Sequence, residues 1–266
     1  MASPIITLLT DFGTSDAFVG IMKGVILGIH AEVRIVDVTH AVPPQQVLPA
    51  ALLLRSAVPY FPPATIHVVV VDPGVGSTRR ALVIETAHGI LVGPDNGVLS
   101  LAAVRMAPRV ARHITNTALF RHPLSQTFHG RDVFAPVAAH LSHGVVPEVC
   151  GPVVDAMIEL TVPAVQRLPR RLSGEVIYTD HFGNLITNID ADALASFTVP
   201  RLSVSIANIQ VAGPVQTYAA VAPGMPLAIV GSWGMLEIAV RNGSAADSFA
   251  AGPGTPVTVV VESRDA

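Results

Sequence analysis

The sequence predicts a layered α/β domain with a mostly parallel sheet, followed by a smaller all-β domain. Three observations support this prediction. In the first half, apolar runs of strand length alternate with longer segments of helical periodicity. These runs are continuous in hydrophobicity, as in strands covered by helices on both faces. From about residue 163, short strand-like runs separated by Gly and Pro replace the helical periodicity.

The elements follow in chain order. Apolar runs at 4–10, 33–39, 65–71 and 81–87 are predicted strands, and six apolar residues between 18 and 29 recur at helical spacing. A second helical pattern starts near Arg131. The stretch 163–172 is rich in Pro and Arg and is a predicted linker between an α/β domain (1–162) and a β domain (173–266). Strand-like runs in the second domain begin at 174, 202, 226, 236 and 256.

Composition excludes several classes of protein. The 266 residues are 50% hydrophobic with a net charge of −3 and no basic block, so we expect no nucleic-acid partner. No apolar run reaches the length of a membrane span, and the first 13 residues contain Asp11 and no basic region, unlike a signal peptide. We therefore expect a soluble cytoplasmic protein. Cys150 is the sole cysteine, which excludes an internal disulfide and favours a buried residue without a chemical role.

Acidic residues recur where apolar runs stop. These residues are Asp11, Asp72, Asp95 and Asp180. In open α/β sheets, ligands bind at the carboxyl ends of the strands, so this set indicates a binding site. The alternative is ordinary turn chemistry, since Asp beside Gly or Pro is common in turns.

Familiar catalytic motifs are missing from the sequence. The DFG at 11–13 and the HGRD at 129–132 lie in the wrong order for a protein kinase, and Lys23 is the only lysine. No phosphate loop, dinucleotide fingerprint, nucleophile elbow or zinc-protease motif occurs. The chain has ten histidines, and the first candidates for metal ligands are His113, His122, His129, His140 and His143. They lack a matched carboxylate motif, so we expect no metal. His129, where a loop enters a helix, is a candidate titratable group at a cleft.

Two loops of the second domain combine aromatic and polar side chains. Asp180, Phe182 and Asn184 fall within five residues, and Ser232 and Trp233 lie between glycines. An aromatic face together with donors and acceptors suits a heterocyclic ligand. The alternative is structural, with Phe182 in a core and Asn184 in a turn.

Six segments carry a resemblance that runs in order from about residue 5 to 245. They are TDFGTSDAFVG, VVVVDPGVGSTRR, GPDNG, TFHGRDVFAP, DHFGNLITNI and GSWGMLEIAV. Together they resemble the S-adenosyl-L-methionine (SAM) hydroxide adenosyltransferase family, which is related to fluorinase and chlorinase. The resemblance implies an amino-terminal α/β domain, a carboxyl-terminal β-barrel, and metal-independent hydrolysis of SAM to adenosine and L-methionine without a cofactor. It also implies a homotrimer with sites at subunit interfaces.

The same resemblance implies roles for individual residues. Asp72, Arg79 and His129 form the catalytic set. Asp11 holds the ribose diol, Asp16 is a second acid of that loop, and Phe128 and Phe182 surround the ligand. Asn184 contacts the adenine edge, Asp180 and Ser232 hold the methionine amino and carboxylate groups, and Glu237 and the backbone near Val240 close over adenine. Trp233 stands where fluorinase has Arg, so the carboxylate is expected to depend on Ser232 and backbone donors.

Three interpretations stay open at this point. The leading one is hydrolysis, with His129 as candidate base, Asp72 orienting it or the water, and the two able to exchange roles. Arg80 is expected to be a solvated arginine facing away from Asp72, because adjacent side chains of an extended segment point to opposite faces. Halogenation at C5′ is disfavoured, because the halogenating relatives carry a Tyr where Asp72 stands and a Tyr-Ser pair where His129-Gly130 stand. A binding protein without turnover is the third possibility, and it would not need the Asp-Arg-His set.

Overall fold

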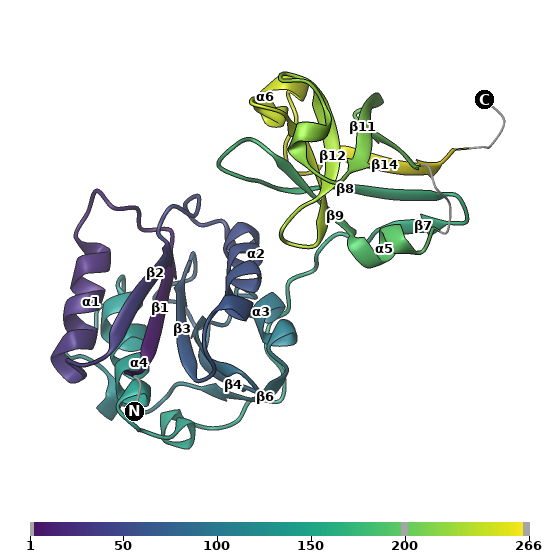
Figure 1. The fold of residues 1–266 in the computed structure, drawn as a ribbon. Coiled ribbons are helices and arrows are strands. Elements are labelled where there is room, and N and C mark those ends of the chain that lie inside the picture. The colour runs from purple at the N-terminus through teal and green to yellow at the C-terminus, as the bar shows by residue number, and fades with distance from the viewer. Residues whose placement is uncertain (1–2, 198–201, 263–266) are drawn as a thin grey trace. The chain divides into compact units, whose positions relative to one another are not determined.

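The computed structural model describes residues 3–197 and 202–262, and the chain divides into two compact units, residues 1–160 and 161–266 (Figure 1). Across the described ranges, no helix is both long and apolar enough to cross a bilayer. The predicted fold class, an α/β domain followed by a β-barrel, is confirmed.

The amino-terminal unit is an α/β domain. Its strands are β1 (Ile5–Thr10), β2 (Arg34–Thr39), β3 (Thr65–Val70), β4 (Ala81–Thr86), β5 (Gly89–Pro94) and β6 (Pro108–His113). Its α-helices are α1 (Phe18–Ile29), α2 (Val47–Ala57), α3 (Ser100–Arg105) and α4 (Ala135–Ser142). Short helical turns are η1 (Val58–Tyr60), η2 (Thr117–Leu119), η4 (Pro147–Cys150) and the π-helical η3 (Gly130–Phe134).

The sheet of this unit has the strand order β2-β1-β3-β5-β4-β6. Strands β2, β1, β3 and β5 pair in parallel, whereas β4 runs antiparallel to both of its neighbours. The edge strand β6 was not predicted, because its Pro and Arg residues do not form an apolar run. The prediction of two covered faces holds for β1 and β3 but not for β2, which is an edge strand and mostly exposed or half-buried.

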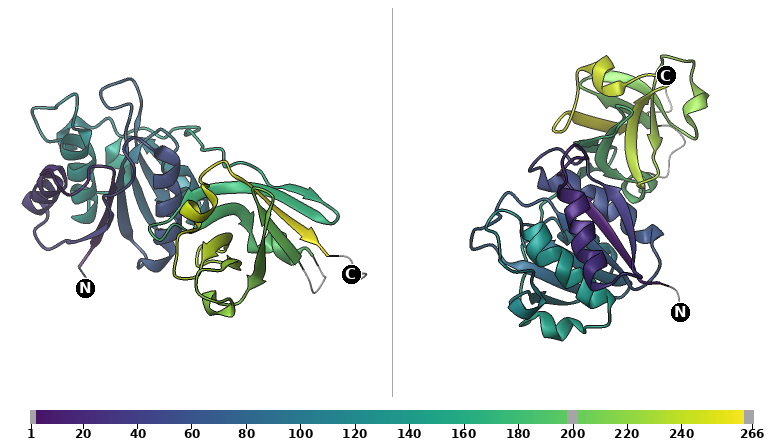
Figure 2. Two further views of the ribbon diagram at one scale, coloured as in Figure 1. Left: turned by 90° about the horizontal axis from the view of Figure 1, so that it is seen from above. Right: turned by 90° about the vertical axis from the view of Figure 1, so that its left-hand side faces the viewer.

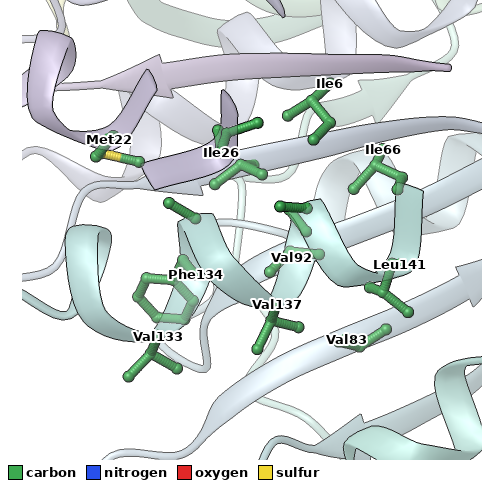
Figure 3. Close-up of a cluster of buried hydrophobic side chains, with 14 of the residues drawn as sticks. Ile6, Met22, Ile26, Ile66, Val83, Val92, Val133, Phe134, Val137 and Leu141 are labelled. Carbon is green, nitrogen blue, oxygen red and sulfur yellow. The ribbon is translucent and has the colours of Figure 1, made fainter. Parts of the chain in front are cut away.

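Two apolar layers enclose the sheet. On one face, Met22 and Ile26 of α1 and Phe134 of η3 pack with sheet residues such as Ile6 and Ile66 (Figure 3). On the other face, residues of α2 and α3 pack against alternate residues of the same strands. Figure 2 shows α1 and α4, in purple and teal, on one side of the strands and α2, in blue, on the other. Cys150 is free and buried in the first layer, as expected.

The carboxyl-terminal unit is a β-barrel with two short helices. Its strands are β7 (Gln166–Leu168), β8 (Arg171–Thr179), β9 (Leu185–Asp190), β10 (Leu202–Ile206), β11 (Ile209–Val215), β12 (Pro226–Val230), β13 (Met235–Val240) and β14 (Pro256–Val261). Its helices are α5 (Ala191–Ala195), α6 (Ala245–Phe249) and the 3₁₀ turn η5 (Tyr218–Ala220). Pairing of β14 with β8 closes the sheet into a ring, and β7 is added to β8 outside that ring.

The predicted linker 163–172 is not a free connection. Residues 166–168 form β7, residues from Arg171 onward belong to β8, and the carbonyl of Pro163 accepts a hydrogen bond of 2.8 Å from Asn188 Nδ2. Polar residues next to Pro suggest a loop, but an edge strand outside a barrel tolerates them because its side chains stay in water. All three residues of β7 are exposed.

Candidate active site

Two strand-end acids of the amino-terminal unit lie at one edge of the sheet. Strands β1 and β3 are parallel neighbours with Thr10 opposite Val70, so Asp11 and Asp72 follow them at the same edge. Both side chains line one cavity of about 380 Å³. The hypothesis that strand-end carboxylates mark a ligand site therefore has a geometric basis for this pair.

Asp72 begins a compact turn between β3 and β4. Its carbonyl accepts from the backbone N–H of Val75, and the carbonyl of Gly74 accepts from that of Ser77. Gly76 has a φ of +77°, and a Cβ there would lie 2.4 Å from the carbonyl oxygen of Gln126. A side chain at position 76 would push this turn away from the loop that leads to His129.

Arg79 returns from this turn and joins Asp72 to His129. Its Nε lies 3.0 Å from both carboxylate oxygens of Asp72, its Nη2 donates to Asp72 Oδ2, and the same Nη2 lies 2.7 Å from His129 Nδ1. The guanidinium also lies over the ring of Phe134, 5.4 Å from its centroid. The structure thus brings together Asp72, Arg79 and His129, which are separated by up to 57 positions in the sequence. Asp72 and His129 line the cavity, whereas Arg79 is not among its lining residues.

The contact with Arg79 fixes the tautomer of His129. A guanidinium can only donate, so Nδ1 of His129 accepts and the ring proton of the neutral imidazole is on Nε2. Burial and the charge of Arg79 lower the pKa of His129, against the opposing effects of Asp72 and Asp132. Nε2 is buried and has no hydrogen-bond partner among the described residues. Within the described part of the chain, the Nε2–H group is therefore an unsatisfied donor.

Phenylalanines form the apolar side of the same cavity. Phe12, Phe18 and Phe128 lie with ring centroids 5.3–5.8 Å apart. Asp11 accepts a hydrogen bond of 2.7 Å from the backbone N–H of Gln45, which has a φ of +65°. Asp16 is exposed in the loop before α1 and does not line the cavity. Phe18 was predicted only as a helix residue, and no sequence pattern indicated that Gln45 lines the cavity.

The neighbouring arginine has a different partner. Arg80 points away from Asp72, as expected, but it is not simply solvated: its Nε donates to Asp95 at 2.7 Å and its Nη2 to the carbonyl of Ala156 at 2.7 Å. Asp95 also accepts from the N–H of Ile158 at 2.8 Å. These contacts account for Asp95, a third strand-end acid, as a structural ion-pair partner that ties 156–158 to the sheet.

The carboxyl-terminal unit has its own cavity, of about 660 Å³. Its lining includes every residue predicted for ligand contact in this unit: Asp180, Phe182, Asn184, Ser232, Trp233, Glu237 and Val240. Asp180 shapes one wall by accepting from the N–H groups of Phe182 and Asn184 and from Asn184 Nδ2, at 2.8–2.9 Å. Gly183, between them, has a φ of +80°, and a Cβ there would collide with Ser244. Phe182 is exposed, which contradicts the alternative that it belongs to a core.

Trp233 and Tyr218 also line this cavity. Trp233 stacks on Tyr178 with centroids 5.2 Å apart and planes inclined by 28°. Tyr218 donates a hydrogen bond of 2.6 Å to Glu237 Oε1. Tyr218 was not predicted as a site residue, because it lies in a Pro-bounded loop 19 residues from Glu237. The acid inside the apolar run of β13 was the only available signal of this pair.

Histidines and acids do not gather into a metal-binding group of three or more anywhere in ranges 3–197 and 202–262. His140 lies on α4 and His143 at its carboxyl end, where the His143 ring contacts that of His30. His122 Nε2 lies 3.0 Å from the carbonyl oxygen of Thr117.

Comparison with known proteins shows which family the sequence matches. The models of the SAM hydroxide adenosyltransferase N-terminal and C-terminal domains match residues 6–151 and 174–258. The chain is 41% identical over 260 residues to an (R)-S-adenosyl-L-methionine hydrolase of Salinispora tropica, covering 97% of this chain and 98% of that protein. A protein of the same name from Thermus thermophilus is 40% identical over 264 residues, covering 95% and 98%.

A more distant relative and a solved structure also match the chain. A fluorinase of Actinopolyspora mzabensis is 28% identical over 220 residues, or 73% of this chain and 74% of that protein. The crystal structure of an uncharacterized conserved protein from Thermotoga maritima superposes with a TM-score of 0.91 at 36% identity, covering 96% of this chain and all of that one. The chain belongs to the SAM hydroxide adenosyltransferase family.

Proposed function

We propose that this protein hydrolyses S-adenosyl-L-methionine to adenosine and L-methionine, by attack of water on the ribose C5′ carbon. The observation that supports it most directly is the contact of Arg79 with both Asp72 and His129 at the wall of a cavity. The names of the relatives at 40–41% identity support the substrate and the reaction.

Catalysis of this reaction requires activation of the nucleophile and not of the leaving group. Sulfur leaves C5′ as a neutral thioether, which needs no proton, so no general acid is required. Water must be aimed in line with the C5′–S bond and must lose a proton as it attacks. A cation about 4 Å away stabilises hydroxide by roughly 4 kcal/mol at an effective dielectric constant near 20, a factor of about 10³ in acidity. Free hydroxide therefore stays rare at neutral pH, and a base is needed in the transition state.

The hydrogen bonds favour Asp72 as that base. His129 accepts from Arg79 at Nδ1, so its Nε2 carries the ring proton and cannot take a proton from water. Asp72 is held on one side by Arg79 and retains lone pairs toward the cavity. The sequence led us to expect His129 as the base and Asp72 as the orienting residue, and this assignment reverses those two roles. Arg79 acts as a positioning residue for both.

The remaining residues are assigned to substrate binding. In the amino-terminal unit these are Asp11 for the ribose diol, Phe128 for the ligand face, and Asp16 as a second acid. In the carboxyl-terminal unit, Phe182 and Asn184 contact adenine, Asp180 and Ser232 bind the methionine end, and Trp233, Glu237 and Val240 complete the cavity. We further propose a cytoplasmic homotrimer in which neighbouring subunits complete each site, without metal or cofactor.

Incubation of the purified protein with SAM in H₂¹⁸O tests the proposal. Adenosine and methionine should form in equal amounts, with one ¹⁸O in the 5′-hydroxyl of adenosine. Asp72→Asn should abolish most of this product while SAM still binds. Absence of both products, or adenosine without label, would contradict hydrolysis at C5′. A halonucleoside formed when chloride or fluoride is added would instead favour halogenation.

A further inference from the structure

Glu237 is a buried acid on the outer face of the barrel. Its neighbours in β13, Leu236 and Ile238, belong to the barrel core, so alternation along the strand turns Glu237 outward. The residue is nonetheless only 7% exposed, because the segment that contains η5 covers its side chain. A buried carboxyl group is costly unless it is paired, so this position calls for a partner.

The partners in the structure satisfy only half of this carboxyl group. Tyr218 donates to Oε1, whereas Oε2 lies against Gly231 and accepts no hydrogen bond within the described residues. Arg241 is the cationic side chain of the cavity lining, and its Nη1 donates to the carbonyls of Ala219 and Val221. This contact holds the η5 segment over Glu237.

A second acid, Asp180, lines the same cavity and acts on Glu237. Burial raises the pKa of Glu237, and the nearby charge of Asp180 raises it further, against the effect of the Tyr218 hydrogen bond. Burial and Asp180 raise the pKa of Tyr178 as well. An added cation would relieve this repulsion and favour the ionised form of Glu237. Phe182, Trp233 and Tyr218 line the same cavity, and aromatic rings attract cations.

We propose that this cavity selects its ligand by an ammonium group held between Glu237 and Asp180, and that adenosyl sulfonium ions lacking a carboxylate are therefore substrates too. The proposal rests on the proposed hydrolysis and extends its substrate class to amines such as S-adenosyl-3-(methylthio)propylamine. It assigns Glu237 to the amine instead of to adenine. Tyr218 is the positioning residue for Glu237.

The reaction of such a substrate balances without another reactant. Water forms the C5′–O bond as the C5′–S bond breaks, and the electron pair of that bond goes to sulfur. The products are adenosine, 3-(methylthio)propylammonium and one proton released to solvent. The ammonium group keeps its proton throughout.

Three sulfonium compounds test the proposal: SAM, S-adenosyl-3-(methylthio)propylamine, and 5′-dimethylsulfonio-5′-deoxyadenosine, which lacks both amine and carboxylate. Loss of the carboxylate alone should lower kcat/KM by about tenfold, the low end of the range for one hydrogen bond to a charged group. Loss of the amine should lower it by about 30-fold or more, as for truncation of a buried charge pair. Equal losses for the two analogues would overturn the proposal.

Variants distinguish the groups involved. Glu237→Gln should weaken both amine substrates and leave the dimethylsulfonio compound unchanged, and Tyr218→Phe should do the same to a smaller extent. Asp192→Asn, at an exposed acid of α5 outside the cavity, should change none of the three. Arg241→Gln should affect the two amine substrates alike, and a selective loss with SAM would assign the carboxylate to Arg241 and contradict the proposal.

A binding measurement separates this proposal from the hydrolysis itself. Trp233, the only tryptophan of the chain, lies in the cavity wall, so its fluorescence reports occupancy without turnover. If SAM is bound but not hydrolysed, the proposed function fails while the cation site can still be measured. Tighter binding of the aminopropyl compound than of the dimethylsulfonio compound supports the site, and equal binding overturns it.

Discussion

Arg79 Nη2 lies 2.7 Å from His129 Nδ1. Two cationic groups cannot share such a contact, so the imidazole is neutral and its Nε2 is a donor. Of Asp72 and His129, this hydrogen bond decides which residue is able to accept the proton of an attacking water.

We expect Arg79 to support catalysis and the adjacent Arg80 to support stability. Arg79→Ala should lower kcat by about 10²-fold or more, because Asp72 and His129 lose their common partner. Arg80→Ala should leave kcat unchanged and lower the free energy of unfolding by about 2 kcal/mol, because Asp95 loses a charged hydrogen bond. Steady-state kinetics and urea denaturation of both variants measure this. A kinetic defect in Arg80→Ala would show that the two side chains act together.

Substitutions of Asp72 and His129 test which of them is the base. Asp72→Asn should lower kcat by about 10²–10⁴-fold, the usual contribution of general-base catalysis. His129→Ala should cost less, about 10–100-fold, the size of a lost hydrogen bond to a charged group. Both should bind SAM with unchanged affinity by Trp233 fluorescence. The reverse order of kcat losses would return the role of base to His129.

The protonation of His129 should follow its contact with Arg79. Its pKa is below the ordinary value of 6.5, mainly through burial and then through the charge of Arg79. The imidazole therefore stays neutral as the pH falls through 6.5 and takes its proton only at lower pH. NMR titration should show this midpoint, and it should move upward in Arg79→Met, where the charge of Arg79 no longer opposes Asp72 and Asp132. An unchanged midpoint in that variant would contradict the coupling.

Acid should destabilise the protein through His67. Its side chain is buried beside Thr7, with Nδ1 2.8 Å from the hydroxyl, and burial lowers its pKa to about 4. The unfolded chain takes up this proton near pH 6.5 and the folded chain only near pH 4, so unfolding becomes easier as the pH falls between these values. The contribution is about 3 kcal/mol. Urea denaturation between pH 4 and pH 6.5 measures the free energy of unfolding of wild type and His67→Asn. This free energy should depend less steeply on pH in the variant.

Two glycines with positive φ should differ in their effect on the substrate. Gly183→Ala should raise KM, because the new Cβ collides with Ser244 and displaces the loop of Phe182 and Asn184. Gly254 has a similar φ of +88° but open space around it, so Gly254→Ala should cost only backbone strain of about 1 kcal/mol. KM and unfolding free energy measured together distinguish the two effects. Equal KM values would contradict the role of the 180–184 loop.

The sequence by itself determined the main elements and the acids that follow them. Continuous apolar runs predicted β1 and β3, and Asp11 and Asp72 directly after them predicted the edge where a ligand site lies, because hydrophobic pattern and turn residues are local properties of the chain. The tertiary structure decided what no local pattern contains. In the folded protein, Arg79 pairs with Asp72, and Arg80 pairs with Asp95. Strand β4 runs antiparallel to β5, and part of the predicted linker forms β7. Tyr218 donates a hydrogen bond to Glu237. Each of these depends on contacts between segments distant in sequence, where burial and charge select one partner among several that the sequence would allow.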